Sequence, residues 1–327
     1  MKKEYFLAIF IIVFLAGCSM PKVGLLKETP DPLKEYTLEG TAADKILLIG
    51  VNGMISDKPK KGFLSESPSL VEQVVVQLNR AQKDRKIKAV LLKINSPGGT
   101  ITASDILYHE ISSYREKTGN KITVCMMDVA ASGAYYMSLP ADVILAHPTT
   151  ITGSVGVISL QPKIKGLMDK IGVGVDVQKT GKYKDMGSPY RETGDEEKKL
   201  MQKAMESFGG RFIDLVKKHR KLSKEALAEV STARIFLSDE ALKIGLIDKI
   251  GYISDAVKET KKLAGLPDDA KVVVYRRAEF PEDNYYNIAG AAAGTLNPSL
   301  INLELLEILN AKAGFYYLWP GAIAADR

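Results

Sequence analysis

Cysteine and histidine are scarce in this chain of 327 residues, which contains two cysteines and three histidines. No cluster of Cys and His has the spacing of metal ligands, so the sequence predicts neither a metal site nor a cofactor. Both cysteines, Cys18 and Cys125, would be needed for an intramolecular disulfide. Cys125 lies in the apolar run 122–127, where a small buried side chain is the simpler interpretation.

An excess of charge of one sign is also missing. The formal net charge is only +6, the basic residues form no long blocks, and aromatic residues, 7% of the chain, do not alternate with them. This pattern excludes the electrostatic footprint of a nucleic-acid-binding protein. Hydrophobic residues make up 46% and charged residues 26%, which is typical of a chain that buries a full core.

The N-terminal apolar run, residues 6–15, is too short to span a bilayer, because a spanning helix needs about 20 residues. Lys2 and Lys3 precede it, and Leu15-Ala16-Gly17-Cys18 follows. This arrangement is typical of a secretory signal peptide, here residues 1–17, and its end resembles a bacterial lipobox. We therefore expect Cys18 to carry lipid, which leaves no disulfide and places the protein outside the cytoplasm on a bacterial membrane. A signal anchor that is never cleaved is the alternative.

Residues 18–43 are polar and contain proline, as a tether from lipid to domain should. Beyond them, short apolar runs alternate with segments of helical periodicity, which predicts an α/β domain over 44–265 with a mostly parallel sheet. The expected strands are 45–51, 89–94, 121–127 and 143–146. The expected helices are 68–83, with Ser67-Pro68 at its start, and 103–116.

The character of the sequence changes from residue 194. A charged helix from 194 to about 220, a second beginning at Ser223 and a third over 252–264 predict a mainly helical extension on the same core. Residues 266–327 are expected to hold a strand at 272–275, a short amphipathic helix at 300–309 and an aromatic tail. The tail, Phe315 to Pro320, is either an exposed contact surface or a segment packed on the core.

A Ser-His-Asp triad requires a histidine in a suitable place. His109 and His219 lie in charged helical stretches, where a solvated position is expected. His147 follows an expected strand and is the remaining candidate. A neutral lysine can also activate a serine, provided that its ammonium group is desolvated so that its pKa falls.

Ser132 fits the nucleophile of such a pair. It lies in Ala130-Ala131-Ser132-Gly133-Ala134-Tyr135, directly after an expected strand, and its small neighbours leave room for a peptide backbone. Asn95-Ser96-Pro97-Gly98-Gly99 ends another strand, and its consecutive glycines can turn backbone N–H groups toward a developing negative charge. Alternatively, the first segment is a close-packed helix start and the second is an ordinary turn.

These two segments, together with residues 152–157, 181–185 and 241–248, occur in the order seen in signal peptide peptidase A, and the chain resembles that family over about 45–260. The resemblance implies a Clp protease/crotonase-like fold, a superhelix of strand-strand-helix units with a mainly helical C-terminal extension. It implies that Ser132 is the nucleophile and Lys184 the general base, with Lys182 as the nearest wrong choice. Gly98 or Gly99 would supply the main oxyanion N–H, Gly133 a second, and Ser154 would hold the lysine amine.

The resemblance further implies a membrane-associated serine endopeptidase for short hydrophobic peptides such as cleaved signal peptides. It implies a homo-oligomeric ring in which serine and lysine come from neighbouring protomers. Many relatives carry an N-terminal transmembrane helix where this chain has a segment that resembles a lipobox. The alternatives are a non-catalytic membrane-associated scaffold and a crotonase-like acyl-thioester enzyme on the same fold.

Overall fold

The computed structural model describes residues 32–61, 66–277, 280, 283–287 and 314–322. The signal peptide, Cys18 and the helix expected at 300–309 lie outside these ranges. The chain divides into residues 1–33 and 34–327, and all elements described below belong to the second unit. None of the described helices combines the length and the hydropathy that crossing a bilayer requires.

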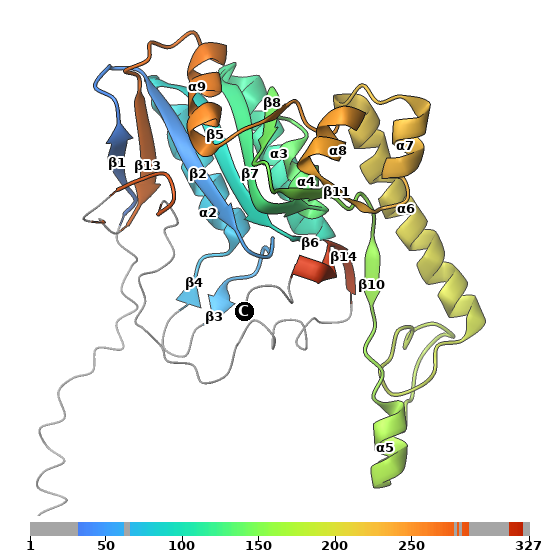
Figure 1. Cartoon of the computed structure of the whole chain (residues 1–327). Coiled ribbons are helices and arrows are strands. Elements are labelled where there is room, and N and C mark those ends of the chain that lie inside the picture. The colour runs from blue at the N-terminus through green and yellow to red at the C-terminus, as the bar shows by residue number, and fades with distance from the viewer. Residues whose placement is uncertain (1–31, 62–65, 278–279, 281–282, 288–313, 323–327) are drawn as a thin grey trace, which may run out of the picture. The chain divides into compact units, whose positions relative to one another are not determined.

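The core of this unit is a nine-stranded sheet with the order β1-β13-β2-β5-β7-β8-β12 (Figure 1). In addition, β9 pairs with the last residues of β7, and β11 pairs with β9. All pairings from β13 to β12 and the pairing of β7 with β9 are parallel, whereas β1 and β11 run antiparallel to their neighbours. The strands are β1 (Lys34–Glu39), β2 (Lys45–Asn52), β5 (Ile87–Ser96), β7 (Lys121–Ala131), β8 (Val143–Ala146), β9 (Ile151–Gly153), β11 (Ile235–Leu237), β12 (Lys249–Ile250) and β13 (Lys271–Arg276).

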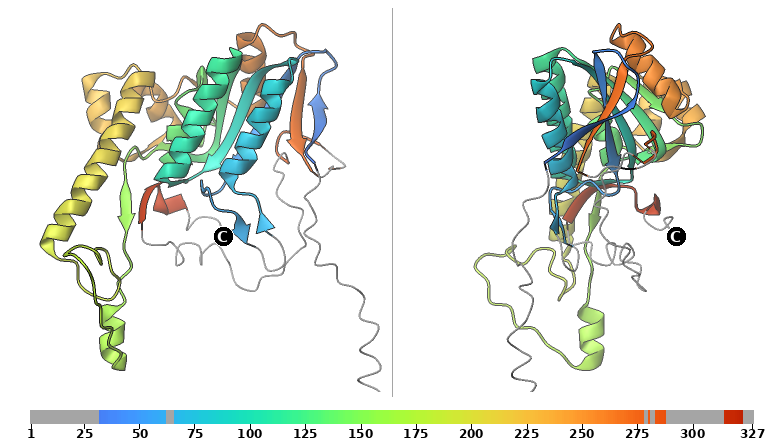
Figure 2. Two further views of the ribbon diagram at one scale, coloured as in Figure 1. Left: turned by 180° about the vertical axis from the view of Figure 1, so that it is seen from behind. Right: turned by 90° about the vertical axis from the view of Figure 1, so that its left-hand side faces the viewer.

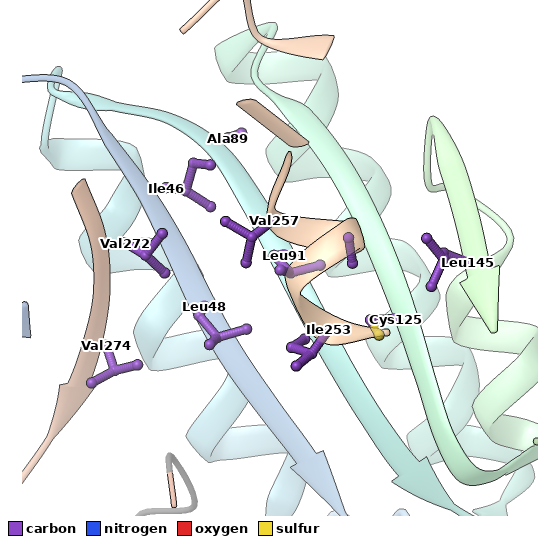
Figure 3. Close-up of a cluster of buried hydrophobic side chains, with 11 residues drawn as sticks. Ile46, Leu48, Ala89, Leu91, Cys125, Leu145, Ile253, Val257, Val272 and Val274 are labelled. Carbon is purple, nitrogen blue, oxygen red and sulfur yellow. The ribbon is translucent and has the colours of Figure 1, made fainter. Parts of the chain in front are cut away.

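Helices cover both faces of the sheet. Helices α2 (Leu70–Lys83) and α3 (Ile101–Thr118) lie on one face and α9 (Ile253–Leu263) on the other (Figure 2). Successive side chains of a strand point to opposite faces, so a strand buried on both faces reads as a continuous apolar run. Side chains of α9 and of the five strands beneath it form a buried cluster (Figure 3): Ile46, Leu48, Ala89, Leu91, Cys125, Leu145, Ile253, Ala256, Val257, Val272 and Val274.

The alternation of strands and helices predicted from the sequence is confirmed, with small shifts of bounds. Helix α2 begins two residues later than expected, because the Oγ of Ser69, not that of Ser67, accepts a hydrogen bond from Glu72 N and caps the helix. Thr100 caps α3 in the same way, and Gly119 ends α3 with a φ of 70°, a left-handed conformation that suits glycine.

The predicted tether is wrong for its last part. Residues 34–39 form β1, which pairs with β13 over Lys34↔Arg276 to Glu39↔Val272. The sequence of these residues is moderately polar and therefore does not predict a strand, because an edge strand buries only part of its surface and need not be apolar. β13 also lies inside the main sheet, next to β2, so the domain extends beyond the expected limit at residue 265.

The helical extension is confirmed. Its long helix, α6 (Asp195–His219), starts with three acidic residues and ends with three basic ones, which complements the helix dipole. The extension also contains the shorter helices α7 (Lys224–Val230) and α8 (Ser238–Ile244). Two other short helices, α4 (Gly133–Ser138) and α5 (Lys165–Ile171), precede it in the chain.

Two small sheets complete the described structure. One has the order β10-β14-β6 and contains β10 (Ile158–Leu160), β14 (Gly314–Leu318) and β6 (Gly98–Thr100); the other pairs β3 (Lys60–Lys61) with β4 (Glu66–Ser67). A short 3₁₀ helix, Pro320–Ala322, follows β14. Of the two interpretations of the aromatic tail, packing on the core is confirmed, since Tyr316, Tyr317 and Leu318 are all buried.

Candidate active site

Ser132 stands at a sharp turn between a strand and a helix. Strand β7 ends at Ala131, and α4 starts at Gly133. Between them Ser132 has φ 53° and ψ −114°, a conformation that costs free energy for a residue with a side chain. The Ser132 N–H donates to Gly153 O at 2.8 Å, and Tyr136 N donates to Ser132 O at 2.9 Å, so both ends of the turn are fixed.

The Ser132 hydroxyl is buried and lacks a hydrogen-bond partner among the described atoms. Only 1% of the residue is exposed. Leaving a buried hydroxyl unpaired costs about 1–3 kcal/mol, so most structural serines avoid this state. Strain and an unsatisfied hydroxyl at one residue are together typical of a functional position.

Gly98, Gly99 and Gly133 lie around this turn, and a side chain at any of them would come too close to neighbouring atoms. A Cβ on Gly98, whose φ is +98°, would lie 2.7 Å from Gly133 N, and one on Gly133 would lie 3.2 Å from Gly99 N. Gly98 and Gly99 therefore lie directly against the start of α4, as the order of the motifs implied. The N–H of Gly98 donates to Ser96 Oγ at 3.2 Å.

Ser154 lies beside Ser132 because β9 pairs in parallel with β7, with Ala131 opposite Gly153. Ser154 also has a positive φ, 52°, and is 8% exposed. Its N–H donates to the carbonyl of Arg234 at 2.9 Å. Sequence reasoning missed Arg234, which contacts Ser154 through its backbone carbonyl and so leaves no signal in a motif.

Buried tyrosines fix α4. The Tyr135 hydroxyl donates to Leu246 O at 2.8 Å, and the Tyr136 hydroxyl donates to Asp105 Oδ1 at 2.6 Å. Burial raises the pKa of both phenols above the ordinary range, so they stay protonated donors. Arg211 from α6 also binds Asp105, at 2.7 Å, which ties α3, α4 and α6 together.

The three histidines do not reach Ser132. The His147 ring hydrogen-bonds Thr149 and packs edge-on against Tyr252, His219 hydrogen-bonds the Tyr108 hydroxyl, and His109 is exposed. Since Ser132 Oγ has no partner in the described part of the chain, no triad is formed there.

The two candidate lysines differ in their surroundings. Lys182 Nζ forms an ion pair with Glu196, which raises the pKa of the ammonium group, the opposite of what a neutral base requires. Lys184 is exposed, and its side chain has no hydrogen bond or ion pair among the described residues. Within one chain Lys184 does not contact Ser132, whose hydroxyl is unpaired.

A network of charged groups braces the turn that carries Lys184. Asp185 accepts hydrogen bonds from Lys179 and Arg191, and Arg191 also binds Glu197 at the start of α6. Hydrogen bonds from Arg191 and Lys179 lower the pKa of Asp185 below its usual range, so this carboxylate remains charged. The backbone of the turn is thus held while the Lys184 amine stays free.

Sequence reasoning also missed β14 as a neighbour of the site. Tyr317 pairs with Gly99, and Leu318 with Gly98. The concentration of aromatic residues at 315–319 was the available signal, but it did not show which strand they join.

Cys125 is fully buried, and burial raises the pKa of its thiol to about 12, which confirms a small buried hydrophobe. In the ranges that the structure describes, His, Cys, Asp and Glu form no group of three or more that could hold a metal ion.

Comparison with protein families gives two matches. The model of peptidase family S49 matches residues 114–267, which include Ser132, Ser154 and Lys184. The Clp protease model matches residues 66–144, which include Gly98, Gly99 and the Ser132 turn. The α/β architecture and the second match confirm the expected Clp protease-like fold.

Individual relatives agree. A protein named signal peptide peptidase SppA from Enterococcus faecium is 37% identical over 245 residues, which are 75% of this chain and 71% of the relative. A protease of Methanocaldococcus jannaschii is 37% identical over 61% of this chain and 63% of its own length. Protease 4 of Haemophilus influenzae is 32% identical over 79% of this chain, but the match spans only 40% of that longer protein. The chain therefore belongs to peptidase family S49, the family of signal peptide peptidase A and its serine-type relatives.

Proposed function

We propose that this protein is a membrane-anchored serine endopeptidase that degrades short hydrophobic peptides such as cleaved signal peptides. Ser132 is the nucleophile and Lys184 the general base. The observation that carries the proposal is Ser132 itself, because its hydroxyl is buried and unpaired on a strained turn beside Gly98, Gly99 and Gly133.

The proposed reaction is acyl transfer to Ser132 followed by hydrolysis of the acyl ester. Ser132 Oγ attacks the carbonyl carbon of the substrate while its proton passes to neutral Lys184 Nζ. Backbone N–H groups at Gly98 or Gly99 and at Gly133 stabilise the oxyanion. The C–N bond then breaks, Lys184 returns the proton to the leaving amine, and an acyl ester remains on Ser132. Water gives a proton to neutral Lys184 and attacks the ester carbonyl; the bond to Ser132 Oγ then breaks, and Lys184 passes the proton to Ser132 Oγ, which releases the acid and restores both the serine hydroxyl and the neutral amine.

Lys184 fits the base better than Lys182 does. Lys182 is paired with Glu196, and this pair favours the charged form of the amine. Lys184 has no such partner to lose. Because the base acts in its neutral form, the rate of hydrolysis should rise toward alkaline pH.

A neighbouring protomer would supply the lysine. Among the residues that the structure describes, no base of the same chain contacts Ser132 Oγ, and the segment that leads to Lys184 exposes apolar side chains. Leu167 is 61% exposed and Ile171 63%, and α5 has no buried residue. Exposed apolar groups of this kind mark a contact surface. Supporting members of the same segment are Ile164, Val173, Val175 and Val177. A homo-oligomeric ring would cover them and bring Lys184 to Ser132 of the next subunit.

Anchoring through Cys18 would place this site near its substrates. The charged start, short apolar run and Leu15-Ala16-Gly17-Cys18 support a lipid on the cysteine after removal of residues 1–17. The protein would then be extracytoplasmic, held by its lipid to a bacterial membrane.

The test is reaction of the full chain with a fluorophosphonate probe, followed by mass spectrometry of the labelled peptide. We compare wild type with Ser132→Ala, Lys184→Ala and the matched control Lys182→Ala. Wild type and Lys182→Ala should carry one adduct on Ser132, whereas Ser132→Ala and Lys184→Ala should carry none. An absence of adduct in assembled wild-type protein would contradict the proposal and favour a non-catalytic scaffold.

A further inference from the structure

Among the residues that the structure describes, three other than glycine have a positive φ, and backbone hydrogen bonds connect them. Ser132, Ser154 and Ala233 have φ values of 53°, 52° and 60°. Ser132 N donates to Gly153 O at 2.8 Å. Ser154 N donates to the carbonyl of Arg234, the residue after Ala233, at 2.9 Å. A left-handed conformation costs free energy for a residue with a Cβ, so it persists only where the surroundings fix it. The turn at Ala233 is therefore linked to both serines.

The Ala233 methyl group lies directly against the loop that follows Ser154. A Cβ on Gly156 would lie 2.6 Å from Ala233 Cβ. Because carbon atoms pack at about 3.5–4.0 Å, a side chain at Gly156 would displace one of the two segments by about 1 Å. Val155, between Ser154 and Gly156, is buried, so this loop is packed on its inner side as well. Ala233 therefore limits where the loop that carries Ser154 can lie.

Phe236 packs against the residue that holds Ser132. β11 pairs antiparallel with β9, with Phe236 opposite Thr152. A Cβ on Gly153 would lie 2.6 Å from Phe236 Cδ2 and 3.2 Å from Arg234 O. The Phe236 ring is fully buried. Gly153 is thus held by a ring and a carbonyl from one short segment, and its own carbonyl accepts the Ser132 N–H.

The side chain of Arg234 ties this segment to the helical extension, whose helix α8 lies beside β11 (Figure 1). The guanidinium lies over the Phe236 ring, with Cζ 3.9 Å from the ring centroid. Nε pairs with Glu229 of α7 at 3.0 Å, and Nη1 pairs with Glu240 of α8 at 3.5 Å. The Arg234 side chain is 41% exposed, and ion pairs so exposed contribute little to the stability of a fold. Contacts on three sides do, however, fix the orientation of the turn.

We propose that Arg234 and Ala233 are positioning residues for the serine chemistry. Arg234 holds the Ser154 N–H through its carbonyl, and Ala233 limits the loop after Ser154. Together they set where the Ser154 hydroxyl lies relative to Ser132. The inference rests on the proposed peptidase function and adds to it two residues that act on the catalytic rate through the backbone. A displacement of about 1 Å in a catalytic group can lower a rate by up to about 100-fold.

The first arm of the test is a double-mutant cycle on the contact between Gly156 and Ala233. Gly156→Ala should lower kcat for a fluorogenic peptide by about tenfold and change KM by less than about twofold, because it moves the Ser154 loop. Fluorophosphonate labelling of Ser132 should slow by about the same factor. Adding Ala233→Gly removes the colliding methyl group, and glycine adopts this φ without strain. The double variant and Ala233→Gly alone should therefore stay within about threefold of wild type.

Gly210 on α6 offers the matched control, because a Cβ there meets nothing within 4 Å. Gly210→Ala should match wild type in kcat and in labelling. Denaturant unfolding and the mass of the assembled protein are measured for every variant. These measurements separate a loss of fold or of assembly from a loss of rate.

The second arm changes an exposed side chain and so remains informative if Gly156→Ala does not fold. Arg234→Ala removes the contacts of the guanidinium and should lower kcat by about fivefold, with KM changed by less than about twofold. Arg115→Ala is the control, since Arg115 is 45% exposed and pairs with Asp142 at 2.6 Å. Both variants should unfold close to wild type. Arg234→Ala alone should slow labelling of Ser132.

Slower labelling of Gly156→Ala that Ala233→Gly reverses, together with slower turnover of Arg234→Ala than of Arg115→Ala, supports the inference. Wild-type kcat in folded Gly156→Ala or in Arg234→Ala would overturn it. So would a folded double variant that stays as slow as Gly156→Ala. If wild-type protein itself does not react with the probe, the peptidase function fails and the inference fails with it, which is a separate outcome.

Discussion

Ser132 and Ser154 stand at equivalent ends of two paired parallel strands, with φ values of 53° and 52°. The N–H of Ser132 donates to the carbonyl of Gly153, the residue before Ser154, so the two turns are coupled through one hydrogen bond of 2.8 Å. Two serines in a strained conformation at the same sheet edge indicate a site in which hydroxyl positions matter more than local stability.

Ser132→Ala should abolish hydrolysis and raise stability. Loss of the nucleophile should lower kcat by at least about 10³-fold. Because the hydroxyl is buried and unpaired, its removal should raise the free energy of unfolding by about 1 kcal/mol. Ser138 offers the matched control, since its Oγ is equally buried but donates to Ala134 O at 2.7 Å. Ser138→Ala should lower the free energy of unfolding by about 1 kcal/mol. Chemical denaturation measures both, and destabilisation of equal size would contradict the functional interpretation.

Gly98→Ala should be far more harmful than Gly119→Ala. Both glycines have positive φ, +98° and +70°. A Cβ on Gly119 meets nothing within 4 Å, whereas one on Gly98 lies 2.2 Å from Tyr317 O and 2.7 Å from Gly133 N. Gly119→Ala should therefore cost about 1 kcal/mol from backbone strain alone. Gly98→Ala should cost more and should also slow probe labelling of Ser132. Equal unfolding free energies for the two variants would show that no close contact exists at Gly98.

Ser132→Ala and Lys184→Ala should complement each other in mixed oligomers. Each variant alone lacks one catalytic group at every site. If serine and lysine come from different protomers, mixing and reassembly creates sites that have both groups, and peptide hydrolysis returns to a fraction of the wild-type rate. A mixture of Ser132→Ala with a Ser132→Ala/Lys184→Ala double variant is the control and should stay inactive. No recovery in a verified mixed oligomer would place both groups in one chain.

Asp105 should contribute stability that depends on pH. Burial alone would raise the pKa of this carboxyl, but hydrogen bonds from Tyr136 and Arg211 outweigh it, and the pKa is lowered from the ordinary 3.8. A lowered pKa in the folded state means that the stabilisation is present above the unfolded value and is lost as pH falls through the folded value. The Asp105 side chain is 38% exposed, so solvent screening reduces the contribution of its ion pair. Asp105→Asn should lower the free energy of unfolding by less than about 1 kcal/mol at pH 7, and this difference should shrink below about pH 4.

Thermal or denaturant unfolding between pH 7 and pH 3 measures that difference. Asp214→Asn is the control, because it removes an exposed ion pair with Lys217 within helix α6. An exposed ion pair contributes little to stability, so the free energy of unfolding of Asp214→Asn should equal that of wild type at every pH. A difference for Asp105→Asn that stays constant down to pH 3 would contradict the assignment.

Cys18→Ser should release the protein from the membrane fraction of a bacterial host and remove a lipid-sized mass from the N-terminal peptide. Cys125→Ser is the control, because that thiol is buried in the core and should leave fractionation unchanged. Retention of Cys18→Ser in the membrane with an intact N-terminus would favour the uncleaved signal anchor.

Most elements of the core could be predicted from the sequence. The runs 45–51 and 89–94 are apolar on both faces, as is typical of parallel strands that are covered on both faces. The helix between them shows apolar residues with a period of 3.6. The small residues around Ser132 and the pair Gly98-Gly99 marked two turns, and the family resemblance assigned roles to them. In each case the signal is local, because burial and backbone conformation restrict which residues can occupy a position.

Pairing between distant segments was decided only by the tertiary structure. The polar composition of residues 34–39 does not predict β1, because an edge strand need not be apolar. The position of β14 between β6 and β10 depends on contacts between segments far apart in the sequence. The same holds for the unpaired Ser132 hydroxyl and for the separation of Lys184 from it within one chain. Sequence patterns report whether a side chain is buried, but the partner that buries it is set by packing of the whole chain and, for Lys184, by the proposed neighbouring subunit.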